Sequence, residues 1–125
     1  VYGEALESQR YFLGDDMDFR QFTDIPTAAM WMFSPDAGPQ PGFVADIRGA
    51  ASVAHVYGKD LVAAESLTSA LAPWVSAPRE MKPVIDLEFA LGVNRPIIHS
   101  SVHQPRDDKK PGLSLSIFGA VSQPS

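Results

Sequence analysis

The amino-acid sequence predicts an α/β fold in which parallel strands alternate with helices. Its short apolar runs lack polar alternation, which is typical of parallel strands covered on both faces. Segments with helical periodicity separate these runs. Polar side chains follow several of the runs, and parallel α/β folds bind their ligands at the carboxyl ends of the strands. We therefore expect a functional site along that edge of the sheet.

The expected strands are short runs bounded by turn-forming or polar residues. They lie at residues 1–3, 28–33, 61–64 and 96–98, and residues 113–118 are expected to form a last strand or an extended segment. Residues 34–42 are expected to be irregular, because three prolines and two glycines fall within them.

Two longer segments are expected to be helical. Residues 43–57 place apolar side chains near one face, and Gly58 stands where a glycine often ends a helix. Residues 83–91 begin with a proline, which suits a first helical turn, and Gly92 follows them. A short helix is also expected at 19–22.

The composition excludes several functional classes. The 125 residues include 10 lysines and arginines against 15 aspartates and glutamates, a net charge of −5. This acidic balance argues against a nucleic-acid partner, because phosphate binding needs a basic surface. Without cysteine there is no disulfide, thiolate zinc site or cysteine nucleophile. No apolar run reaches the roughly 18 residues of a membrane span, so no membrane partner is expected.

Glu65 is the expected catalytic residue. It follows the apolar run 61–64 and precedes two hydroxyl residues, Ser66 and Thr68. A carboxylate at a strand end can activate water or hold a sugar hydroxyl. The alternative is a surface glutamate at the start of a helix, since glutamate is usually exposed.

His99 and His103 follow the run 96–98 and are expected to bind a ligand. On a helix, their spacing of four would place both on one face, where they could hold a metal. Pro96 and Pro105 flank them, however, so a strand followed by a loop is expected, and the motif contains no acidic third ligand. Hydrogen bonding to a polyhydroxylated ligand is therefore favoured.

Trp31 and Trp74 lie beside proline-rich loops and are candidates for sugar contacts. The apolar faces of sugars stack on indole rings, while their hydroxyls bond to carboxylates. Filling the core is an equally good explanation for either tryptophan.

Asp15, Asp16 and Asp18 form an acidic group that could hold a cation. The group lacks the glycine and the terminal glutamate of a helix–loop–helix calcium site. A solvated acidic loop is therefore favoured.

Several motifs resemble those of the α-L-rhamnosidases of glycoside hydrolase family 106. The most specific are the helix that leads to Ala64-Glu65-Ser66 and the segment His103-Gln104-Pro105. Ile25-Pro26 and Met30-Trp31 fit the same family less specifically, and the resemblance runs roughly from Glu4 to Gly119.

The resemblance implies a partial (β/α)8 barrel of the TIM type. Residues 1–125 would form about its C-terminal half, truncated at both ends within a longer, exported enzyme. Such enzymes remove terminal α-linked L-rhamnose from glycans or glycosides by an inverting mechanism that uses a general-acid and a general-base carboxylate. Glu65 matches the base, and Glu4, His99 and His103 match positions that line the active site. The general acid is expected upstream, so the chain alone is expected to be inactive.

The resemblance further implies a Ca²⁺ ion that contacts the sugar, with ligands that the sequence does not assign. The expected partners are a rhamnose-containing glycan or glycoside and the rest of the enzyme's own chain. One position departs from the family. Many relatives have an acidic residue before the tryptophan of the Met30-Trp31 motif, where this chain has Ala29, which weakens the expectation that this strand end contacts the sugar.

Two alternatives remain open. In a retaining glycosidase barrel of another family, Glu65 would be the nucleophile, and the configuration of the product would distinguish the two mechanisms. A non-catalytic carbohydrate-binding barrel fragment would bind rhamnose without hydrolysis.

Overall fold

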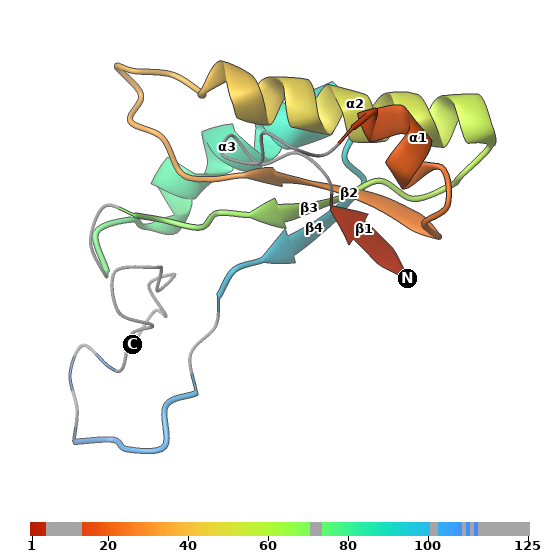
Figure 1. Cartoon of the computed structure of the whole chain (residues 1–125). Coiled ribbons are helices and arrows are strands. Elements are labelled where there is room, and N and C mark those ends of the chain that lie inside the picture. The colour runs from red at the N-terminus through yellow and green to blue at the C-terminus, as the bar shows by residue number, and fades with distance from the viewer. Residues whose placement is uncertain (5–13, 71–73, 101–102, 109, 111, 113–125) are drawn as a thin grey trace.

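The computed structural model describes residues 1–4, 14–70, 74–100, 103–108, 110 and 112. Strands and helices alternate along this part of the chain, as Figure 1 shows. Their order is β1 (Tyr2–Glu4), α1 (Asp16–Arg20), β2 (Ile25–Met30), α2 (Pro41–Tyr57), β3 (Ala63–Ser66), α3 (Pro78–Leu91) and β4 (Arg95–Ile98). The predicted segment 113–118 lies outside the described residues.

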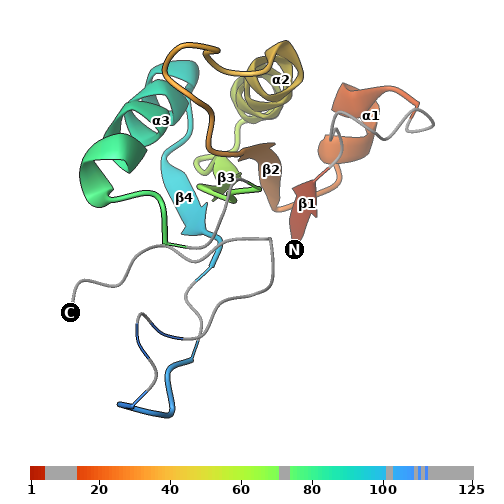
Figure 2. The same cartoon turned by 90° about the vertical axis from the view of Figure 1, so that its left-hand side faces the viewer.

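The strands form one parallel sheet in the order β1-β2-β3-β4, which confirms the α/β prediction. The helices lie on one side of this sheet. In Figure 1, α2 and α3 lie above it, and Figure 2 shows α1 on the same side, near β1. No described helix covers the other face. In a (β/α)8 barrel the helices form an outer ring around the strands, so this one-sided cover is consistent with a partial barrel.

A side-chain contact on the face without helices indicates that the sheet is curved. The guanidinium carbon of Arg95 lies 5.8 Å from the centroid of the Tyr2 ring, although β2 and β3 separate their strands. In a flat sheet, three strand spacings would put β1 about 14 Å from β4. The contact therefore fits a sheet that curves towards its helix-free face, as the inside of a barrel does.

The apolar face of α2 packs on β2. Pro41 occupies the first turn of the helix, where a missing N–H costs no hydrogen bond, so α2 begins two residues earlier than predicted. It ends at Gly58 as predicted, with a left-handed φ of 66° and a hydrogen bond from the glycine N–H to the Ala54 carbonyl. Its buried face includes Phe43, Ile47, Ala50, Ala51 and Ala54.

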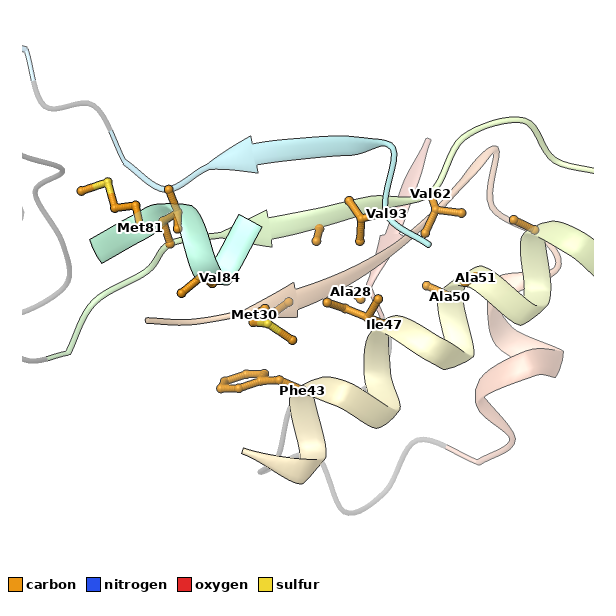
Figure 3. Packing of buried hydrophobic residues seen from close by; sticks show 14 residues of the cluster. Ala28, Met30, Phe43, Ile47, Ala50, Ala51, Val62, Met81, Val84 and Val93 are labelled. Atoms are coloured by element: carbon orange, nitrogen blue, oxygen red, sulfur yellow. The ribbon is translucent and has the colours of Figure 1, made fainter. Parts of the chain in front are cut away.

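The core lies between the sheet and the pair α2 and α3. Figure 3 shows this cluster, which joins Met30 of β2 with Phe43 and Ile47 of α2 and with Met81 and Val84 of α3. Alanines fill much of the remaining layer, and they let helix and sheet approach closely.

The predicted start of α3 was wrong. The helix begins at Pro78, and Pro83 lies inside it. The Glu80 carboxylate reaches back and accepts a hydrogen bond from the Ala77 N–H at 2.9 Å, which fixes the earlier start. Both Pro78 and Pro83 suit the first turn of a helix, and the contact between Ala77 and Glu80 shows that the helix begins at Pro78. Gly92 ends the helix as predicted, with a φ of 112°.

Other predicted element bounds were also shifted, because pairing and capping set the ends of an element. Strand β3 spans residues 63–66 where 61–64 was expected, since Asn94 holds Val62 ahead of the ladder through a 2.9 Å bond from the Val62 N–H to the Asn94 Oδ1. Strand β2 starts early, at Ile25, whose N–H bonds to the carbonyl of Val1. Helix α1 starts after Asp15, which caps it.

None of the described helices is both long and apolar enough to cross a membrane.

Candidate active site

The carboxyl ends of the four strands meet at one edge of the sheet. This edge faces the viewer in Figure 2. Glu4 is the last residue of β1, Trp31 follows β2, Glu65 lies near the end of β3 and His99 follows β4. The structure therefore places these four predicted residues along the edge where parallel α/β folds bind ligands.

Glu65 lies within β3, not after it. The register pairs it with Ala29 on one side and Ile97 on the other, so the three side chains project from the same face of the sheet. That face is the helix-free one, because the next residue, Ser66, bonds to α3 on the opposite face. The Glu65 side chain is 27% exposed, so it is partly desolvated yet accessible.

Thr68 joins Glu65 to His99. Its hydroxyl donates a hydrogen bond to Oε1 of Glu65 and lies 3.0 Å from Nδ1 of His99. The same imidazole nitrogen is 3.9 Å from the carboxylate oxygen. A carboxylate, a buried hydroxyl and an imidazole thus form one hydrogen-bonded group, which can accept a proton and orient a polyhydroxylated ligand.

The backbone fixes this group from two directions. The Leu67 N–H bonds to the carbonyl of Met30 at 3.1 Å, and the Met32 N–H bonds to the carbonyl of Thr68 at 2.8 Å. The His99 N–H bonds to the carbonyl of Ser66 at 2.9 Å. These backbone hydrogen bonds lie just beyond the carboxyl ends of the strands. They hold the segments after β2, β3 and β4 together.

Leu67 supplies the turn between Glu65 and Thr68. Its φ of 69° lies in the left-handed region, which is uncommon for a residue with a branched side chain. This conformation redirects the chain after β3, and the side chains of Glu65 and Thr68 then meet. Backbone strain of this kind often occurs at functional sites.

The two other predicted residues at this edge have different surroundings. Trp31 packs against Phe43 of α2, with ring centroids 5.8 Å apart and ring planes inclined by 33°. Trp31 therefore packs against the hydrophobic core. Its contact with a sugar stays a prediction. Glu4 is partly buried at the end of β1, and its role as a lining residue also stays a prediction.

No hydrogen bond or ion pair between described residues joins Trp74 or His103 to Glu65, Thr68 or His99. Trp74 instead lies near Gly112 and Gln104. A Cβ built on Gly112 would come within 3.1 Å of the Trp74 ring and 2.7 Å of the Gln104 Oε1. His103 is exposed. The binding roles of both residues stay predictions.

The acidic group near α1 has partners that explain it without a cation. The Asp15 carboxylate caps α1, accepting hydrogen bonds from the N–H groups of Met17 and Asp18 at 2.8 and 3.1 Å. Asp16 bonds to Arg20 at 2.6 Å. Burial raises the pKa of Asp16, while Arg20 opposes the rise. Among the described residues, no three acidic or histidine side chains gather as a metal site, and the Ca²⁺ ion stays a prediction.

Two buried carboxyl groups were missed by the sequence analysis. On α2, Asp46 forms an ion pair with Arg20, and its other oxygen accepts a hydrogen bond from the Ala29 N–H at 2.9 Å. On α3, Glu88 accepts a 2.7 Å bond from the Ser66 hydroxyl. Burial raises the pKa of Asp46 to about 6, against the effect of Arg20, and raises that of Glu88 to about 7.

A signal for both carboxyl groups was present in the helical pattern. Asp46 interrupts the apolar stripe of α2 between Phe43 and Ala50, and Glu88 continues the stripe of Met81 and Val84 on α3. An acidic residue on a helix face that is otherwise buried needs a partner, and that requirement could have identified them.

Comparison with known proteins places the chain among glycosidases. A family model described as alpha-L-rhamnosidase, that of glycoside hydrolase family 106, matches residues 1–123. The solved structure of a rhamnosidase from Novosphingobium sp. PP1Y is 63% identical to this chain, covers 96% of it and superposes with a TM-score of 0.89.

A more distant relative has a different name. A protein of Formosa agariphila, provisionally named a beta-glucuronidase, is 36% identical over 105 residues, or 84% of this chain. The chain spans only 11% of the Novosphingobium rhamnosidase and 8% of the Formosa protein.

Proposed function

Because this chain belongs to the α-L-rhamnosidase family, glycoside hydrolase family 106, we propose that it forms part of the catalytic barrel of a longer enzyme that cleaves terminal α-L-rhamnose from glycans or glycosides. The small share of its relatives that it spans supports the proposal that it is a segment. A Ca²⁺ requirement and export of the enzyme stay predictions.

Glu65 is the general base in this proposal. The observation that carries the assignment is the Glu65–Thr68–His99 group at the carboxyl edge of a parallel sheet. Thr68 engages Oε1 of the carboxylate, and no hydrogen bond between described residues engages Oε2. The second oxygen is thus available to accept a proton from water.

Inversion requires a second carboxyl group as the general acid. The two carboxyls of an inverting glycosidase stand about 6.5–9.5 Å apart, which leaves room for the attacking water. We propose that a part of the enzyme outside this chain supplies the acid, and that the chain alone is therefore inactive.

A hybrid enzyme tests the role of Glu65. The hybrid carries this chain in place of the matching segment of the Novosphingobium rhamnosidase, an exchange that the 63% identity favours. Substitution E65Q in the hybrid should lower kcat on an aryl α-L-rhamnoside by about 10²- to 10⁴-fold, the usual contribution of a general base. D86N is the matched control, because Asp86 is an exposed carboxylate on α3 whose one ion pair in the described part of the chain is with Lys82.

Three results would contradict the proposal. Full turnover by E65Q would exclude Glu65 as the base. An α-L-rhamnose product that retains its anomeric configuration, measured by NMR during turnover, would indicate the retaining mechanism with Glu65 as the nucleophile. A hybrid that binds rhamnose without any hydrolysis would support the non-catalytic alternative.

The name of the Formosa relative gives a second substrate class to test. An aryl β-D-glucuronide belongs in the same assay, because this relative is 36% identical to the chain. Faster cleavage of the glucuronide than of the rhamnoside would replace the proposed substrate and leave the role of Glu65 in place.

A further inference from the structure

We propose that Thr68 is a positioning residue, which holds Glu65 in its basic form and fixes the tautomer of His99. The inference rests on the proposed function of Glu65 as the general base. Thr68 itself is 1% exposed, so its hydroxyl acts from behind the two groups and does not meet the substrate.

The protons of the group can be counted. A hydroxyl has one proton to donate and lone pairs to accept with. Thr68 donates its proton to Oε1 of Glu65. It has none left for His99, so Nδ1, at 3.0 Å, must carry a proton and donate it to the Thr68 oxygen. Neutral His99 is then the Nδ1–H tautomer.

The tautomer determines what His99 offers to a ligand. With the proton on Nδ1, the other ring nitrogen, Nε2, is an acceptor. A neutral His99 would accept a hydrogen bond from a sugar hydroxyl and would not donate one. In the same arrangement, Oε1 of Glu65 is occupied and Oε2 is the oxygen that takes the proton from water.

The reverse arrangement makes the opposite prediction. If Glu65 were protonated and donated to Thr68, the hydroxyl would donate to His99, and the imidazole proton would lie on Nε2. Glu65 would then carry its proton towards Thr68 and could not act as a base. The location of one imidazole proton therefore distinguishes the two arrangements.

The position of Thr68 is fixed by its backbone. Its carbonyl accepts the Met32 N–H at 2.8 Å, and the preceding residue, Leu67, donates to Met30 at 3.1 Å. His99 is attached to the same strand through Ser66. The hydroxyl is thus held between the two side chains by bonds that do not depend on the side chains themselves, as a positioning residue requires.

The kinetic test compares two substitutions in the hybrid enzyme. T68V keeps the shape of the side chain and removes the hydroxyl, and we expect kcat on the aryl α-L-rhamnoside to fall about 10- to 100-fold while KM changes less than about threefold. T68S restores the hydroxyl and should keep kcat within about threefold of the unmodified hybrid. T23V is the control, because Thr23 is also buried and, among the described residues, its hydroxyl bonds to the carbonyl of Arg20 alone.

The spectroscopic test measures the tautomer in the 125-residue chain itself. Its three histidines can be labelled with ¹⁵N, and the H55Q and H103Q variants assign the signals. At pH 8, His99 should carry its proton on Nδ1 in the unmodified chain and in T68S. In T68V, which lacks the hydroxyl that accepts the Nδ1 proton, His99 should no longer be held in the Nδ1–H tautomer.

Several results would overturn the proposed role of Thr68. A proton on Nε2 of His99 in the unmodified chain, or T68V kinetics equal to those of the unmodified hybrid, would overturn it. Equal loss of activity in T68S and T68V would also overturn it, because the hydroxyl would then not be responsible. If thermal melting shows that T68V is unfolded, the tautomer of the unmodified chain and the kcat of T68S decide. Full activity of E65Q would contradict the proposed function, whereas the tautomer is read independently of turnover.

Discussion

At the scale of single residues, the buried Glu88 carboxyl links the stability of the fold to pH. Its side chain lies on the helix side of the sheet with the Ser66 hydroxyl as its partner, and Oε1 has no partner among the described residues. Burial raises its pKa from 4.5 to about 7. The folded chain therefore holds a proton on Glu88 at pH values where the unfolded chain has lost it.

The sign of the pH effect follows from this difference. Between pH 4.5 and about 7 the folded state binds more protons than the unfolded state, so stability falls as the pH rises. The contribution of Glu88 is fully present below pH 4.5 and lost above about pH 7, and it amounts to about 3 kcal/mol. Urea unfolding of the chain at pH 4.5 and pH 8 measures it.

The variant E88Q isolates the contribution of Glu88. Its neutral amide does not titrate, so the free energy of unfolding should depend less on pH than in the unmodified chain. Asp46 titrates in both proteins and cancels from the comparison. Equal pH dependence in the two proteins would show that Glu88 does not hold the proton.

The pairing of Glu65 and His99 at one edge could be predicted from the sequence, but the link through Thr68 could not. An apolar run followed by polar side chains marks the end of a strand, and parallel strands bring such ends together. The contact with Thr68 depends on the left-handed φ of 69° at Leu67. Nothing in a leucine signals that conformation, which the bonds to the segments after β2 impose.

At the scale of elements, one ion pair connects three parts of the fold. Arg20 of α1 bonds to Asp46 of α2, and both side chains are fully buried. The second oxygen of Asp46 bonds to the Ala29 N–H of β2. Among the described residues, the ladder between β1 and β2 ends at Glu4↔Thr27, and at Ala29 the acceptor is the Asp46 carboxylate.

Substitution D46N should destabilise the chain by about 3 kcal/mol, the low end for a broken buried ion pair, because it removes the fully buried counter-ion of Arg20 and leaves the partly exposed Asp16 as its remaining carboxylate partner among the described residues. The apolar double variant R20M/D46L should recover only part of this loss. In a simple buried ion pair such a replacement is often neutral, but here it also leaves the Ala29 N–H without an acceptor, at about 1–3 kcal/mol. Urea unfolding measures all three proteins. A double variant as stable as the unmodified chain would contradict the role of Asp46 in β2.

Element types were predicted better than element bounds. Periodicity and glycine stops identified α2 and α3, since both features are local in the sequence. The start of α3 was missed because the choice between Pro78 and Pro83 depends on the reach of Glu80 to Ala77. The bounds of β2 and β3 depend on neighbouring strands, which a local reading of the sequence does not contain.

At the scale of the whole molecule, the sheet has helices on one face and open edges at β1 and β4 in the described part of the chain. Alternate amides of an edge strand point away from its neighbour. In β4 the His99 N–H bonds to the carbonyl of Ser66, so the Ile98 N–H points outward, and Pro96 has no N–H to offer there.

Hydrogen exchange in the isolated chain should resolve this edge. The Ile98 amide should exchange at least about 10-fold faster than the amides of His99 and Ala64, because it lacks a partner in the described sheet. NMR of the chain during exchange into D₂O measures the three rates. Equal protection of Ile98 and His99 would show that another part of the chain covers the edge of β4.

The alanine-rich layer between α2 and the sheet has a consequence for how sequences of relatives should be interpreted. Ala28, Ala50, Ala54 and Ala64 are fully or almost fully buried, and a Cβ on Gly92 would lie only 2.8 Å from that of Ala51. Any larger side chain here would lift a helix from the strands, whichever sugar the enzyme processes. Purifying selection would therefore preserve these small residues even in lineages that adopt a new substrate. Small residues shared among relatives at these positions therefore reflect the distance between the helices and the sheet. Residues that change the substrate specificity have to be sought on the opposite face of the sheet.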